Sequence, residues 1–98
     1  MSINVNAARS EALFASPLQL SQQPTAQQLR EAIMQTVRSL GTRGCAARVA
    51  QEFGDHPDLA VRRMCWARQQ VARMLIADRL QVTRLRPRTA AMATQSAA

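Results

Sequence analysis

The sequence predicts a small all-α protein, because apolar residues recur three or four positions apart in three successive stretches of the chain. These stretches cover residues 26–40, 42–53 and 57–80. Their apolar stripes are Leu29, Ile33, Val37 and Leu40, then Ala46, Val49, Ala50 and Phe53, then Ala60, Met64, Ala67, Val71, Met74 and Leu75. A chain of 98 residues supports one domain of this kind and not two.

Residues with special backbone or capping properties mark the ends of the three predicted helices. Thr25 is a good N-cap, and Gln28 completes a capping box with it. Gly41 closes the first helix and Gly54 closes the second, since glycine tolerates the left-handed conformation in which many helices end. Pro57 then suits the first turn of the third helix.

The third predicted helix has a broad apolar face. Val61, Cys65, Ala72 and Ile76 extend its stripe, with Arg68 among them. A face of this breadth predicts burial on two sides: against the first two helices, and against either the N-terminal segment or a second subunit.

Two segments flank the predicted helical domain of residues 25–80. Residues 1–24 are expected to form a flexible arm that carries an apolar strap, EALFASPLQLS. The strap either covers the core or docks on another protein, and the pattern leaves both roles open. Residues 81–98 are expected to form a basic, mostly disordered tail, in which Pro87 stops any regular structure.

The second and third predicted helices, with the polar turn between them, resemble the helix-turn-helix of bacterial regulators. In VAQEFGDHPDLAVRRM, Ala50 and Gly54 have the Ala-x-x-x-Gly spacing common in that motif. Asp55 stands where the motif usually has an aliphatic residue, which leaves open a turn one residue longer or a plain helical hairpin. The wider pattern of LFAS, GCAARVAQEFGDHP and RRMCWAR is also similar to small actinobacterial proteins of uncharacterised function, and this similarity implies no activity.

The charge of the chain favours an acidic partner such as nucleic acid. The net charge is +7, and the chain has arginine but no lysine. With the helix-turn-helix resemblance, this predicts a small DNA-binding or transcription-associated protein that uses residues 57–80 as its recognition helix and binds as a homodimer. The residues expected to reach bases or phosphates, or to stack on a base, are Arg43, Arg48, Arg62, Arg63, Trp66, Gln69, Gln70 and Arg73.

The alternative prediction is a non-catalytic helical adaptor that binds another protein. Trp66 lies among the polar residues of the third helix, where an aromatic ring is unusual on a bare surface. It either anchors an interface or is covered by Leu13 and Phe14, with arginines packed over the ring. In the adaptor, Trp66 and the LFASPLQL segment contact the partner, and the segment contributes Leu13, Phe14 and Leu18.

The sequence predicts neither an enzyme nor a cofactor or metal site. It has no glycine-rich phosphate loop and no nucleophile paired with a base. His56 has too few ligating neighbours for a metal and is expected to cap a helix. No apolar run could span a membrane and no secretion signal is evident, which predicts a cytoplasmic protein whose Cys45 and Cys65 stay reduced and pack near the core.

Overall fold

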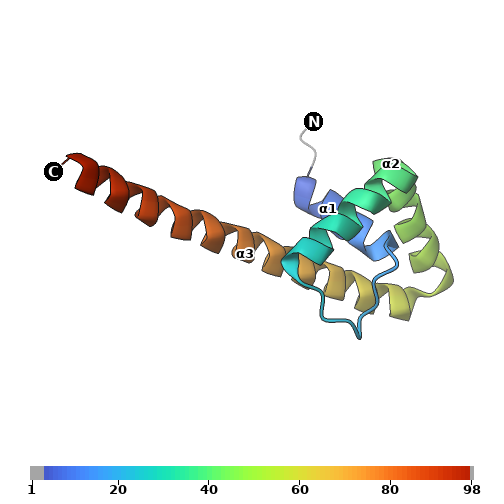
Figure 1. The fold of residues 1–98 in the computed structure, drawn as a ribbon. Helices are drawn as coiled ribbons and strands as arrows, with labels where there is room; N and C mark the ends of the chain where they lie inside the picture. The colour runs from blue at the N-terminus through green and yellow to red at the C-terminus, as the bar shows by residue number, and fades with distance from the viewer. Residues whose placement is uncertain (1–3, 98) are drawn as a thin grey trace.

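The computed structural model describes residues 4–97, with side chains over 4–81, and it confirms the all-α prediction. Helix α1 spans Val5–Ala15, α2 spans Ala26–Asp55 with a break at Gly41, and α3 spans Pro57–Ala97. Each helix packs on both of the others. Figure 1 shows α1 and the two halves of α2 gathered on the first part of α3, which then projects away from the bundle toward the C-terminus.

The helix boundaries follow the local chemistry of a few residues. The Thr25 hydroxyl accepts from the Gln28 backbone N–H at 3.1 Å, and the Gln28 side chain accepts from the Thr25 N–H at 2.8 Å, so the predicted capping box is confirmed. Gly41 has φ 72° and ψ 167°, which confirms the predicted break after residue 40. The predicted end at Gly54 is wrong by one residue, because α2 continues to Asp55 and only His56 separates it from α3.

The N-terminal arm is more regular than the sequence predicted. Residues 5–15 form helix α1, although only the apolar strap was expected to be ordered. The Asn4 side chain accepts from the Ala7 N–H at 3.1 Å and caps the first turn, which the predicted pattern did not include. Leu13 has no exposed surface, so the interpretation of this segment as cover for the core agrees with the structure.

The core lies where the three helices meet. It contains apolar residues from all of them, namely Ala12, Leu13, Phe14, Leu29, Ile33, Cys45, Ala60, Met64, Trp66, Ala67, Val71 and Met74. Five of the six residues in the predicted stripe of the third helix are buried and Leu75 is half-buried, which confirms that stripe.

The predicted stripe of the second helix is wrong by about one residue. Ala46 and Ala50 are exposed and Phe53 is 37% exposed, whereas Cys45 is buried and Val49 is half-buried. The physical reason is the docking of α1 on this half of α2. Cys45 lies near Glu11 of α1 and is 1% exposed, whereas Phe53 stacks on Phe14 with ring centroids 6.1 Å apart and is only partly covered.

The last part of α3 lies outside the residues with described side chains. The backbone continues as helix from residue 82 to residue 97 and points away from the bundle (Figure 1). The predicted basic, disordered tail concerns this segment and stays a prediction. None of the helices in the described part of the chain is both long and apolar enough to cross a membrane.

Candidate interaction surface

Arg63, one of the residues predicted to read DNA, is turned into the fold. Its Nε donates to the carbonyl of Phe14 at 2.7 Å, and its Nη2 donates to the carbonyls of Ser16 and Leu18, each at 2.8 Å. These carbonyls belong to the last turn of α1 and the residues after it, where helical carbonyls lack partners in their own helix. A guanidinium also suits the negative end of the helix dipole, so Arg63 holds the end of α1 against α3.

The same guanidinium lies over two aromatic rings. Its central carbon is 5.1 Å from the centroid of Trp66 and 5.8 Å from that of Phe14, within the range of cation–π contact. Burial lowers the pKa of Arg63 from its ordinary value, and the nearby Glu52 carboxylate opposes this shift. Arginine nevertheless stays charged at neutral pH, so the contacts are made by a cation.

Trp66 is a core residue in this fold. It is 8% exposed, and the linker of residues 16–25 passes beside it. Arg73 lies about three turns beyond Arg63 on α3. It donates to the Gln70 side chain at 2.8 Å and, over a longer 3.4 Å, to the carbonyl of Pro24. Gln70 and Pro24 are both buried. Arg63 and Arg73 therefore tie the two ends of the linker to one side of α3.

The residues predicted to bind a protein partner are also used inside the fold. Leu13 and Phe14 are buried, and Leu18 is half-buried with its carbonyl bound by Arg63. Together with Trp66, they form contacts between α1, the linker and α3. The structure brings these four residues together, as the sequence suggested, but Leu13, Phe14 and Trp66 are buried and Leu18 is half-buried.

The other predicted DNA-contacting residues are exposed but do not share one face. Arg43 and Arg48 lie on the second half of α2, five residues apart, and are thus separated by about 140° around the helix. Arg62 and Gln69 lie on the solvent side of α3. The structure therefore separates the predicted DNA-binding set into buried, linker-bound and scattered exposed residues.

An apolar stripe remains exposed along the solvent side of α3. It consists of Val61, Cys65, Ala72 and Ile76, here called the outer stripe. Val61 is 52% exposed and Ile76 is 58% exposed. The apolar pattern of α3 predicts that these residues belong to a broad buried face. That assignment is wrong for the single chain, because the core widens on the other side of α3, toward Trp66 and Gln70.

Arginine and glutamine side chains border the outer stripe. At about 100° per residue, Arg68 lies on one border, while Arg62 and Gln69 lie on the other. All three are exposed. This arrangement of an apolar centre with a polar rim is typical of a protein interface.

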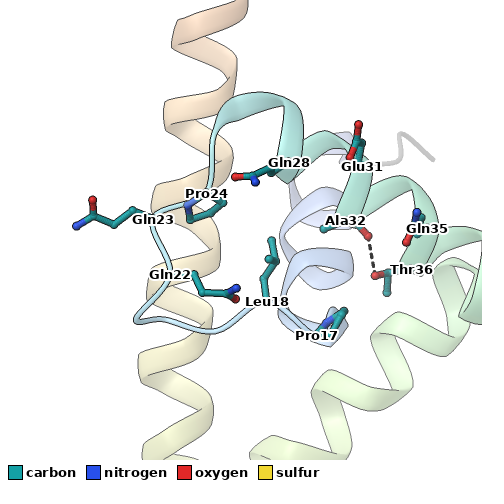
Figure 2. A pocket seen from close by; sticks show the side chains of 10 residues that line it. All are labelled: Pro17, Leu18, Gln22, Gln23, Pro24, Gln28, Glu31, Ala32, Gln35 and Thr36. Atoms are coloured by element: carbon teal, nitrogen blue, oxygen red, sulfur yellow. Dashed lines mark hydrogen bonds between the residues drawn. The ribbon is translucent and has the colours of Figure 1, made fainter.

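A hollow beside the linker is lined by amide side chains, and its lining contains no pair of side chains arranged for catalysis. Figure 2 shows the side chains that line it, between residues 17–24 and the first half of α2, around a volume of about 550 Å³. Glu31 is the single charged residue in this lining. The Thr36 hydroxyl, the one alcohol present, donates to the Ala32 carbonyl of its own helix at 2.7 Å (Figure 2).

No group of three or more metal-ligating side chains occurs within the described part of the chain.

Comparisons with protein-family models, with curated protein sequences and with solved structures found no match to this chain. The candidate site is therefore defined by its own geometry. In the sequence, the outer stripe is visible only as the breadth of an apolar face. The role of Arg63 is not visible there, because its contacts lie 45–49 residues away along the chain.

Proposed function

We propose that this protein is a non-catalytic helical interaction module of the cytoplasm that binds another protein chain through the outer stripe of α3. The observation that carries the proposal is the exposure of Val61 and Ile76 on one face of a helix whose opposite face forms the core. Isolated exposed apolar residues are ordinary, but an aligned set with a polar rim is characteristic of interaction sites.

Two further observations support a protein partner. Cys65 and Ala72, between Val61 and Ile76, are small enough to let a partner helix approach α3 closely. In addition, the first turn of α3 carries the carboxylate of Asp58, three residues after Asp55 at the end of α2. Both carboxylates lie at the end of α3 that a helix-turn-helix protein would present to DNA, where they would repel phosphates.

DNA binding and a role in transcription remain the competing proposal, and the net charge of +7 and the exposed Arg43, Arg48 and Arg62 favour it. This proposal has to rely on phosphate contacts from scattered arginines. Arg63 and Trp66, which were expected to supply base contacts, are occupied within the fold.

The test compares Ile76→Gln with Met34→Gln in affinity purification of the full chain, with and without nuclease. Met34→Gln is the matched control, because Met34 is 52% exposed on α2 and Ile76 is 58% exposed on the outer stripe. The proposal expects a bound protein that survives nuclease, is lost with Ile76→Gln and is retained with Met34→Gln. Binding that nuclease abolishes, that weakens steeply with salt and that Ile76→Gln leaves intact would establish the DNA proposal instead.

A further inference from the structure

We infer that the occupant of the outer stripe is a second copy of this chain, whose α3 packs antiparallel to the first. The inference rests on the proposed function, because it names the partner of the same surface. It is carried by the order of side chains along α3 and by the distribution of charge from one end of the helix to the other.

The outer stripe is self-complementary in one antiparallel register. Its four positions, 61, 65, 72 and 76, are symmetric about the midpoint between residues 68 and 69. When two copies of α3 cross at this midpoint, Val61 of one lies opposite Ile76 of the other, and Cys65 lies opposite Ala72. Large apolar side chains then meet across both ends of the contact, and the small residues lie nearer its middle, where the two helices come closest.

The charges along α3 select the antiparallel arrangement over the parallel one. The start of the helix carries Asp58, with Asp55 just before it. The next turn carries Arg62 and Arg63, of which Arg63 is bound within the fold. Near the other end, Asp78 is paired with Arg30, Arg79 lies on the exposed side, and the chain beyond residue 81 adds three arginines and no acid. Antiparallel pairing brings Asp58 of each copy toward the Arg79 end of the other, whereas parallel pairing would align Asp58 with Asp58.

Arg68 is compatible with this register because of its position at the border. It is exposed and lies close to the midpoint, so the two copies of Arg68 approach each other along the edge of the contact that faces a hollow beside the first turns of α1. Charges that remain in water repel weakly, and their long side chains can splay apart. Gln69 occupies the opposite edge, where its amide can pair with the same amide of the other copy.

The size of the domain gives a reason for such pairing. The core is built from one short helix, two half-helices and the first part of α3, and domains of this size commonly gain stability from oligomerisation. A symmetric dimer with one self-complementary surface is also the commonest form of assembly, and it closes without leaving a further free copy of that surface.

Ala72→Cys tests the register directly. In the inferred dimer, Cys65 of one copy lies opposite position 72 of the other, so mild oxidation should link the copies through disulfides. In the wild type, the two copies of Cys65 are offset by seven residues, or about 10 Å along the helices, which is too far for a disulfide. Ala50→Cys, which places a cysteine at an exposed position on α2, is the matched control.

The expected result is about tenfold or more covalent dimer from Ala72→Cys than from Ala50→Cys, because pairing raises the effective concentration of the two thiols. Sedimentation of the reduced wild type should show a dimer that Ile76→Glu converts to monomer, with unchanged circular dichroism. A wild type that stays monomeric, or equal crosslinking of both cysteine variants, would overturn the inference. If Ile76→Gln nonetheless removes a different bound protein, the proposed function stands without the dimer; if it removes nothing, both fail.

Discussion

Replacing Arg63 by alanine should destabilise the protein more than replacing any other arginine whose side chain is described, because its contacts hold α1 on α3. The change removes the three hydrogen bonds that Arg63 donates to the carbonyls of Phe14, Ser16 and Leu18. Phe14 and Ser16 are buried, so at least two acceptors lose their partner where water has restricted access, and a buried acceptor left unsatisfied costs about 1–3 kcal/mol. The lost cation–π contact with Trp66 adds about 0.5–1 kcal/mol.

Water that enters the space left by the side chain will satisfy part of this need, so we expect a net loss of about 2–4 kcal/mol in the free energy of unfolding. For a domain of this length, such a loss lowers the melting temperature by at least about 8 °C. Arg63→Lys should lose most of the same stability, because one ammonium group cannot reproduce the planar fork that serves three carbonyls.

The assay is urea unfolding followed by far-UV circular dichroism, with Arg62→Ala as the matched control. Arg62 is the exposed neighbour, and its removal should change the free energy of unfolding by less than about 0.5 kcal/mol. If Arg63→Ala and Arg62→Ala unfold at the same urea concentration, Arg63 does not hold α1 in place. If Arg63→Lys is as stable as the wild type, charge alone is sufficient and the fork geometry is irrelevant.

Three other predictions concern single positions. Gly41→Ala should lower the free energy of unfolding by about 1 kcal/mol, because φ is 72° at this position. Gly54→Ala should raise it by up to about 1 kcal/mol, because this position is helical and nothing lies within 4 Å of an added Cβ. If urea unfolding gives the two variants the same change in the free energy of unfolding, the reasoning is wrong. Phe53→Ala should cost about 1–2 kcal/mol in the same assay, less than the roughly 3–5 kcal/mol of a fully buried ring, because Phe53 is 37% exposed; a cost at the higher end would show that it is core. Burial raises the pKa of the Cys45 thiol, so at neutral pH iodoacetamide should modify Cys65 first and Cys45 only on unfolding. The measurement uses the Ile76→Glu variant, which is expected to be monomeric and to leave Cys65 exposed; equal labelling of both thiols in the folded variant would refute this.

Local signals in the sequence were sufficient to predict much of the fold. Thr25 and Gln28 are three residues apart and form their capping box without help from the rest of the chain. Gly41 breaks α2 because of its own backbone freedom. The apolar stripe of α3 was predictable because period and burial agree over several turns.

The candidate site was less predictable because it depends on contacts between distant segments. Arg63 and Trp66 belong to the polar side of the helix by sequence period, yet the docking of α1 and the linker covers both. Helical spacing places Phe53 in the core, but the docked α1 covers it only in part: Phe14 stacks on Phe53, which stays 37% exposed. The outer stripe is exposed for a related reason, since α1 and the linker pack toward the other side of α3 and leave Val61 and Ile76 uncovered.

The contacts of Arg63 have a consequence for the order in which the chain acquires its structure during synthesis. Helix α1 leaves the ribosome before α3, but the guanidinium that binds the carbonyls at and after the end of α1 lies 45–49 residues later. The bond from Arg30 to Asp78 spans 48 residues, and the bond from Arg73 to Pro24 spans 49. An isolated helix as short as α1 is marginal in water. We therefore expect the nascent chain to stay unprotected against proteases until most of residues 57–80 has emerged, and then to fold in one cooperative step.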